Sequence, residues 1–237
     1  MSSVPGRNLT EPEWLSARIA EMGRSWGTTE PRVSGTLWWC MVASALVEQL
    51  ARAYATGTGA PEPVLDRLDC EVRPDGGIER VHILPAAEFE AEPAEPDSTD
   101  VPHGSPPAVV AGRQCAADAA TLNRTCANAL RETLAAVIGP VAAVSGAGVP
   151  SLWAIAADAI GNRALDAGNP DAGTQLASEV GGKLPVPRFV EIGGRSFVRR
   201  ISCCLVFEVP GCEMCTSCPK RPAAERTALL TELAAES

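Results

Sequence analysis

The sequence predicts an α+β fold in which a predominantly helical body carries two β-hairpins and a cysteine-rich C-terminal segment. Long stretches repeat apolar residues at the three- and four-residue spacing of helices. Two turn signals, Pro74–Gly77 and Gly193–Gly194, each separate short runs rich in strand-forming residues. Five of the nine cysteines lie between Ser202 and Lys220. No Gly-rich nucleotide-binding motif occurs, so a Rossmann core is not expected.

Five segments have the periodicity of helices. The second is apolar nearly all round in its first half, which is typical of a helix at the middle of a domain. Its Trp38 and Trp39 are expected to fill the core rather than to face a ligand. We expect Gly139-Pro140 to end the third helix, Ser151 to cap the fourth, and Asn169–Pro187 to be a loop. The expected helices are Glu11–Met22, Ser34–Tyr54, Ala116–Ile138, Ser151–Ala167 and Pro222–Ala235.

The two hairpins are predicted from the turns. The first joins Asp69–Val72 to Ile78–Leu84, and the second joins Arg188–Ile192 to Ser196–Phe207. The second hairpin would place Cys203-Cys204 on a strand, where successive side chains point to opposite faces. Both thiols could then reach one centre only through a bulge or a break in the strand.

Composition limits the function classes. With 46% hydrophobic residues in 237, the chain can bury a core, and its net charge of −9 argues against nucleic acid or an anionic membrane surface as partner. The longest apolar run, Leu37–Val47, is too short for a bilayer, which takes about 20 residues, and no signal peptide is recognised. The acidic, Pro-rich stretch 85–107 is expected to be a long loop. An odd number of clustered cysteines favours metal ligation over disulfides, and therefore a reducing cytoplasm.

The cysteine pattern is Cys203-Cys204, ten residues, then Cys215-x-x-Cys218. Four thiolates suit a structural zinc or an iron–sulfur cluster, and spacing alone does not separate iron from zinc. Cys212 extends the second pair into a run that overlaps the three-cysteine part of a 4Fe–4S ferredoxin motif. Cys203 or Cys204 could complete such a cluster, but a ferredoxin run normally has its proline after a fourth cysteine, which is absent here. We therefore interpret Cys212 as a spare thiol. A redox disulfide is a further alternative.

This C-C-x10-C-x2-C pattern resembles that of the FhuF-type ferric-siderophore reductases. The flanking residues agree with it: a basic residue, Ser-Cys-Cys-Leu at Ser202–Leu205, and Cys-x-x-Cys-Pro at Cys215–Pro219. Upstream, Ser151–Ala159 is similar to a Leu-Trp-Gly-Asn-x-Ala-Ser segment of the family, from which Ala154, Ile155 and Asp158 depart. The resemblance implies a 2Fe–2S cluster held by Cys203, Cys204, Cys215 and Cys218.

The resemblance also implies an activity: one-electron reduction of a ferric siderophore, of the hydroxamate type, that releases Fe(II) in the cytoplasm. An external ferredoxin or flavoprotein would supply the electron. Residues 1–198 would form the body and 199–237 the cluster segment. Candidate substrate contacts are Trp153, the Trp38–Trp39 helix and Arg199 or Arg200, although each of these has an ordinary interpretation as a core or surface residue. The alternatives are an electron carrier or iron–sulfur sensor, and a structural zinc protein.

Overall fold

A computed structural model describes residues 2–85 and 111–236, with side chains described from residue 121 onward in the second range. The chain is 60% helical with two small antiparallel sheets, so the predicted α+β class is confirmed. The acidic stretch 85–107 lies outside the described residues except for Pro85. Within the described ranges, no helix combines the length and the hydrophobicity that crossing a bilayer requires.

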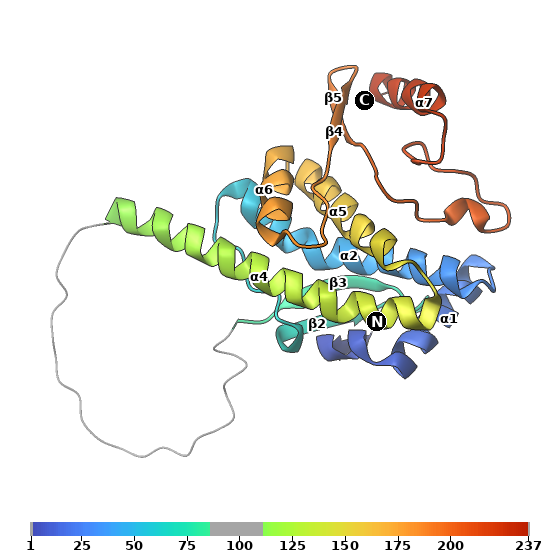
Figure 1. The fold of residues 1–237 in the computed structure, drawn as a ribbon, viewed down its shortest axis with the longest axis horizontal. Helices are drawn as coiled ribbons and strands as arrows, with labels where there is room; N and C mark the ends of the chain where they lie inside the picture. The colour runs from blue at the N-terminus through green and yellow to red at the C-terminus, as the bar shows by residue number, and fades with distance from the viewer. Residues whose placement is uncertain (1, 86–110, 237) are drawn as a thin grey trace, which may run out of the picture.

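Six α-helices are described, and α2 lies at their centre. α5 and α6 pack along one side of α2, and α1 and α4 along the other (Figure 1). This confirms that the all-round apolar helix is the middle of the body. The helices are α1 Pro12–Trp26, α2 Pro31–Thr56, α4 Ala111–Ser145, α5 Val149–Asp166, α6 Pro170–Val180 and α7 Ala223–Ala235.

Most predicted helix ends differ from the structure by a few residues, and the expected stop at Gly139-Pro140, the expected cap at Ser151 and one expected loop are wrong. α4 runs through Pro140 to Ser145, because buried Ile138 and Val141 on either side of the proline keep that turn packed on the core. α5 begins after Gly148, not at Ser151. The expected loop Asn169–Pro187 contains α6, whose first turn Asn169 caps by accepting a hydrogen bond from the Ala172 amide.

Both predicted hairpins form. β2 (Leu68–Val72) and β3 (Ile78–Ile83) make the first, and an unpredicted strand β1 (Ser2–Pro5) pairs with β2, giving the antiparallel order β1-β2-β3. β4 (Phe189–Ile192) and β5 (Arg195–Val198) make the second. β5 packs on α5 and α7 packs on β4, so the second hairpin lies between the helical body and the C-terminus (Figure 1).

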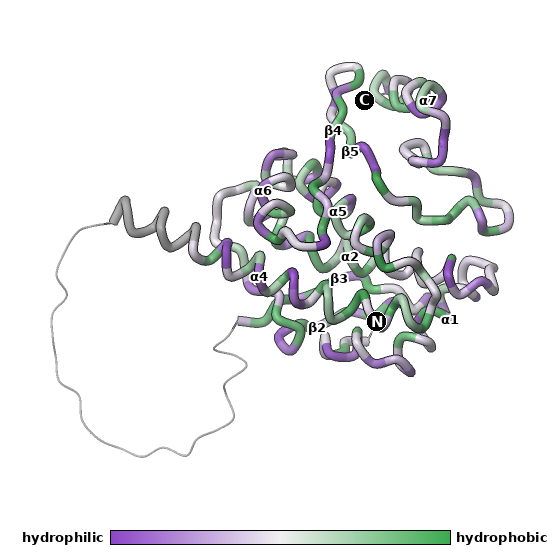
Figure 2. Tube along the Cα trace, in the orientation of Figure 1, coloured by the Kyte–Doolittle hydropathy of each residue, from purple (hydrophilic) through white to green (hydrophobic). Residues whose placement is uncertain are grey.

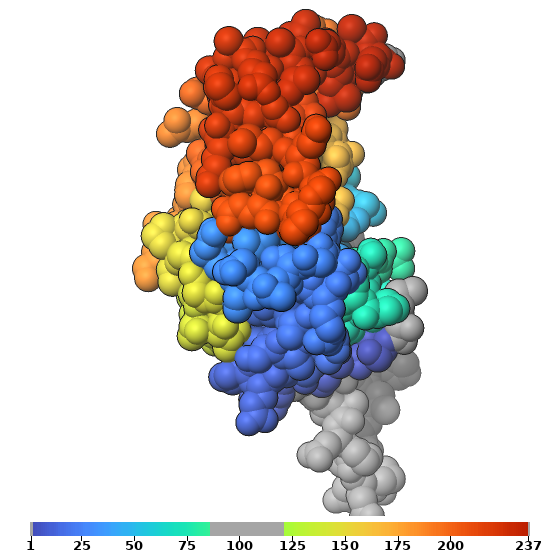
Figure 3. Space-filling model, turned by 90° about the vertical axis from the view of Figure 1, so that its right-hand side faces the viewer, coloured from blue at the N-terminus to red at the C-terminus, as the bar shows by residue number. Residues whose placement is uncertain are grey.

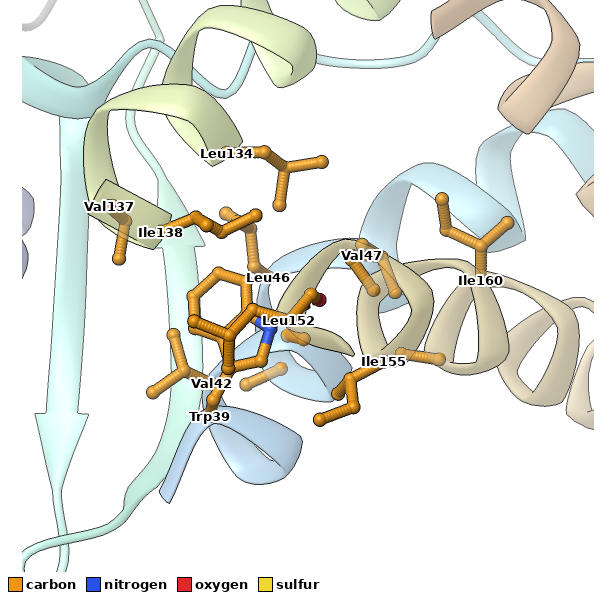
Figure 4. Packing of buried hydrophobic residues seen from close by; sticks show 14 of the residues in the cluster. Trp39, Val42, Leu46, Val47, Leu134, Val137, Ile138, Leu152, Ile155 and Ile160 are labelled. Carbon is orange, nitrogen blue, oxygen red and sulfur yellow. Dashed lines mark hydrogen bonds between the residues drawn. The ribbon is translucent and has the colours of Figure 1, made fainter. Parts of the chain in front are cut away.

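The core is centred on the junction of α2, α4 and α5 (Figure 4). Trp39 is fully buried there, and its indole Nε1 donates to the Leu152 carbonyl oxygen at 2.8 Å. Trp38 is also fully buried, and its Nε1 donates to the Gly76 carbonyl oxygen at 2.9 Å, which ties the turn between β2 and β3 to α2. Both tryptophans are therefore core residues with satisfied polar atoms, which confirms the favoured prediction, and neither indole faces a groove.

Candidate metal centre

The segment that carries the clustered cysteines follows β5 as irregular chain and lies over α2 (Figures 1 and 3). It begins with the hydrophilic Arg199-Arg200 and continues as a hydrophobic run (Figure 2). β5 ends at Val198, so the prediction that Cys203-Cys204 sits on a strand is wrong. Leu205 has φ 64°, a left-handed conformation that no other non-glycine residue adopts in the described part of the chain. The break that four-cysteine ligation requires is thus present next to Cys204.

The irregular backbone brings the cysteines together as two pairs. The Cys203 and Cys218 Sγ atoms lie 3.7 Å apart, which is far beyond a disulfide bond of about 2.05 Å. The thiols of Cys204 and Cys215 share a hydrogen bond, which lowers the pKa of Cys204 and raises that of Cys215. All four are free cysteines. Among the described residues, no three or more His, Cys, Asp or Glu side chains are grouped for a single metal ion.

Two pairs of thiols are the donor set of a two-iron cluster, which takes four thiolates, two on each iron. Cys218 is buried, whereas Cys203, Cys204 and Cys215 are partly exposed at the surface of the segment. The Leu205 amide also donates to the Cys203 Sγ at 3.4 Å. Amide–sulfur hydrogen bonds of this kind tune the reduction potential of iron–sulfur centres.

Arg200 places a positive charge beside these thiols. Its side chain is 16% exposed, its Nη1 lies 3.5 Å from the Cys215 Sγ, and its Nε lies 3.7 Å from an Asp158 carboxylate oxygen. The Nε is buried and has no hydrogen-bond partner in the described structure. A buried guanidinium with a free donor is costly unless anionic groups surround it. Ionised thiolates and the cluster they hold would supply that negative charge, so the residues present fit a 2Fe–2S group.

Asp158 holds the backbone that leads into Cys203. It projects from α5 with 3% exposure and accepts hydrogen bonds from the Ile201 amide (3.0 Å), the Ser202 amide (3.0 Å) and the Ser202 hydroxyl (2.6 Å). Burial raises the pKa of Asp158, while these hydrogen bonds and the charge of Arg200 oppose the rise. Sequence reasoning noted Asp158 only as a departure from a family segment. A lone acid within the apolar run Ala156–Ile160 was the signal that could have identified it.

The turn Cys215–Cys218, which supplies one thiol to each pair, is held from the α7 side. The Cys218 amide donates to the Cys215 carbonyl oxygen at 3.1 Å and closes a turn between them. Arg221 donates from Nε to the same carbonyl at 3.0 Å, and it also contacts the Met214 carbonyl and Glu225. The turn that carries both cysteines is therefore braced by one arginine at the start of α7.

The remaining predicted site residues separate into two groups. Arg200 reaches the cysteines, whereas the neighbouring Arg199 is exposed and its amide donates to the Arg188 carbonyl. Trp153 is 4% exposed and belongs to the core cluster. Its burial supports a role in core packing rather than in substrate contact. Cys212 is half-buried against the core, outside the two thiol pairs.

The two arginines that start the segment give a matched pair for a measurement. We expect Arg200→Gln to make the midpoint potential of the bound cluster more negative, because the lost positive charge favoured the more anionic reduced form. Arg199→Gln, which removes an exposed charge, should leave the potential close to that of the wild type. Spectroelectrochemical titration of both variants measures the difference. Equal potentials for the two variants would show that Arg200 does not act on the centre.

Comparison with known proteins agrees with this donor set. The family model of the FhuF 2Fe–2S C-terminal domain matches residues 200–220, the span that runs from Arg200 past Cys218. No curated protein and no solved structure matches the chain. The match covers the segment with the paired thiols, as the resemblance of its motif implied. Residues 200–220 are therefore similar to the FhuF 2Fe–2S C-terminal domain, and the match points to a 2Fe–2S cluster as the cofactor of this segment.

Proposed function

We propose that this protein reduces ferric siderophores by one electron and so releases Fe(II) in the cytoplasm. The observation that carries the proposal is the match to the FhuF 2Fe–2S domain at the residues whose thiols lie in two pairs. Fe(III) is a hard acid that anionic oxygen ligands hold tightly, and Fe(II) is held far less strongly. One electron therefore frees the metal and leaves the chelator intact.

A bound 2Fe–2S cluster supplies single electrons, and the protein supplies its position and surroundings. Asp158 and Arg221 fix the two cysteine-bearing stretches against α5 and α7. Arg200 adds positive charge in a poorly solvated place, where electrostatic effects are large. Partial exposure of Cys203, Cys204 and Cys215 keeps the centre close to an external partner.

The substrate we propose is a hydroxamate-type ferric chelate. Tris-hydroxamate complexes of Fe(III) are neutral or carry positive charge from the chelator, and the protein has a net charge of −9. A trianionic catecholate complex would approach against that charge. The electron donor we propose is a ferredoxin or a flavoprotein reductase, because the sequence has no nucleotide-binding glycine motif of its own.

The test begins with anaerobic purification and assays of iron, zinc and acid-labile sulfide. We expect about two irons and two sulfides per chain. The protein is then reduced, freed of reductant and mixed with a ferric tris-hydroxamate and an Fe(II)-specific indicator. The expected yield is about one Fe(II) per reduced cluster, since a 2Fe–2S centre passes one electron at a time.

Three other results would contradict the proposal. A loaded protein that reduces small inorganic oxidants but never the ferric chelate would be an electron carrier. Loss of iron without electron delivery to any acceptor would indicate a sensor. One zinc per chain without sulfide would leave a structural metal site.

A further inference from the structure

A hollow of about 350 Å³ opens on the surface of α2. Residues 40–45 of α2 line one side, residues next to the turn of the β2–β3 hairpin line another, and Arg163 of α5 also lines it. None of these residues belongs to the cysteine motif. The residues on which the argument depends are Cys40, Met41, Ser44, Arg73, Glu79 and Arg163.

The walls of the hollow are held in place by specific contacts. Trp38 anchors the hairpin turn through its 2.9 Å hydrogen bond to the Gly76 carbonyl. A Cβ atom at Gly77 would lie 2.5 Å from the Met41 methyl carbon, so the turn and α2 are in close contact here and a larger residue would displace the Met41 side chain. On the other side, the Arg163 Nε donates to the Ser44 carbonyl oxygen at 3.4 Å. The cavity is thus built by tertiary contacts rather than by a loose loop.

Cys40 connects the hollow to the metal centre. It is partly exposed where it lines the hollow, and it packs against the core together with Cys203 and Cys204. Burial raises the pKa of the Cys40 thiol to about 12, and charges on Cys204, Arg200, Asp158 and Cys203 also act on it. Cys40 thus lines the hollow and packs against the same core cluster as Cys203 and Cys204.

The charges around the hollow compensate one another. Arg73 pairs with Asp75 and with Glu79, at 2.8 Å from the latter. Arg163 pairs with Asp166 at 3.2 Å and lies 3.6 Å from Glu48. Of these groups Arg73, Arg163 and Glu79 line the hollow, and the other carboxylates are partners of the two arginines. With Arg52, which also pairs with Glu48, three cations and four carboxylates form this network, so neither lining arginine is left without a counter-charge. Such a rim favours a neutral or cationic ligand with many polar atoms over a multiply charged anion.

We propose that this hollow receives one face of a neutral or cationic ferric tris-hydroxamate, with Cys40 among the residues that line it. The proposal rests on the function proposed above and adds to it the place where the substrate binds. The wall residues Met41 and Ala45 offer apolar contact to the chelator backbone, and the ion-paired arginines offer donors to its carbonyl oxygens.

Binding can be tested without electron transfer by using the gallium(III) complex of a linear tris-hydroxamate. Ga(III) has the charge of Fe(III) but is not reduced by the protein. Calorimetric titration of the cluster-loaded wild type should show binding. Ser44→Trp, which fills the hollow from α2, should weaken binding by about tenfold or more. Glu79→Trp fills it from an exposed strand position and should act in the same direction, which guards against misfolding of the first variant.

The matched control is Ala135→Trp. Ala135 is exposed on α4 and lines a different hollow of about 380 Å³, beside Gly182 and Lys183. This variant should bind the gallium complex as the wild type does. All three variants should keep wild-type helicity and iron content, since none alters a residue that contacts the cysteines.

Absence of binding to the wild type, or undiminished binding to both filling variants, would overturn the inference. Equal weakening in Ala135→Trp would also overturn it, and equal binding of an anionic gallium catecholate would overturn the charge argument. Gallium binding that the filling variants lose, together with an iron complex that is bound but not reduced, would support this site while contradicting the proposed reductase activity.

Discussion

Replacing Cys204 by Ser is expected to abolish the 2Fe–2S centre. The hydrogen bond with Cys215 and the charge of Arg200 lower the pKa of Cys204, which favours the thiolate form that binds iron. A serine hydroxyl does not ionise in this range and is a poor ligand for iron in a sulfur-rich site. We expect iron to fall from about two per chain to a small fraction of that, with loss of the visible absorption and of the electron paramagnetic resonance signal of the reduced protein.

The same loss is expected for Cys203→Ser, Cys215→Ser and Cys218→Ser, because each removes one member of a pair. The chain contains two controls with comparable surroundings. Cys212→Ser and Cys40→Ser also replace half-buried cysteines near the segment, yet neither cysteine belongs to a pair. Both variants should keep about two irons. Full iron content in any of the four ligand variants, or loss of iron in Cys212→Ser, would contradict the assigned ligand set.

The sequence singles out the four cysteines that the structure brings into pairs, because residue type and short-range spacing are both visible in it. The path of the backbone between these cysteines could not be predicted from the sequence. A strand through Cys203 was predicted from the β-branched and aromatic residues around it, yet β5 ends at Val198. The Asp158 carboxylate competes for the Ile201 and Ser202 amides that a continued strand would need for its ladder. That competition is a contact between residues more than forty positions apart, which no local pattern reveals.

In the helical body, too, some features were predictable from the sequence and others were not. The middle position of α2 was predictable from its all-round apolar first half, because such a surface has to be buried on every side. α6 was missed because Pro170, Gly173 and Gly181 suggest a loop. Proline at the first turn and glycine after the last turn are compatible with a helix, and burial of Leu176 and Val180 against the body decides in its favour. The substrate contacts suggested for Trp38 and Trp39 fail for a related reason, since the partners of both indoles come from distant segments.

Replacing Asp158 by Ala is expected to loosen the cysteine segment while leaving the helical body folded. The change removes the acceptor of three hydrogen bonds and the carboxylate nearest to Arg200. Each orphaned, poorly solvated donor costs about 1–3 kcal/mol, and removing one partner of a buried ion pair costs roughly 3–5 kcal/mol in all. Because the hydrogen bonds end at Ile201 and Ser202, most of that loss should appear where the chain enters Cys203. We expect iron to leave the variant at least about tenfold faster in the presence of a chelator, since every 1.4 kcal/mol is a factor of ten.

Asp166→Ala is the matched control, because it removes a carboxylate from the same helix. Asp166 is 65% exposed and pairs with Arg163, and surface pairs of this kind contribute about 0–1 kcal/mol. The iron-loss rate of Asp166→Ala should equal that of the wild type. The rate of Asp158→Asn, which keeps an acceptor oxygen, should fall between those of the wild type and Asp158→Ala.

The midpoint potential distinguishes a positioning role of Asp158 from simple destabilisation. A displaced Arg200 and a shifted Cys203 change the charge and hydrogen bonds around the sulfurs, so Asp158→Ala should shift the potential even in molecules that still hold iron. A wild-type potential with a wild-type rate of iron loss would show that Asp158 does not position the centre. Loss of helicity on the same time scale as loss of iron would show that Asp158 stabilises the helical body rather than the cysteine segment.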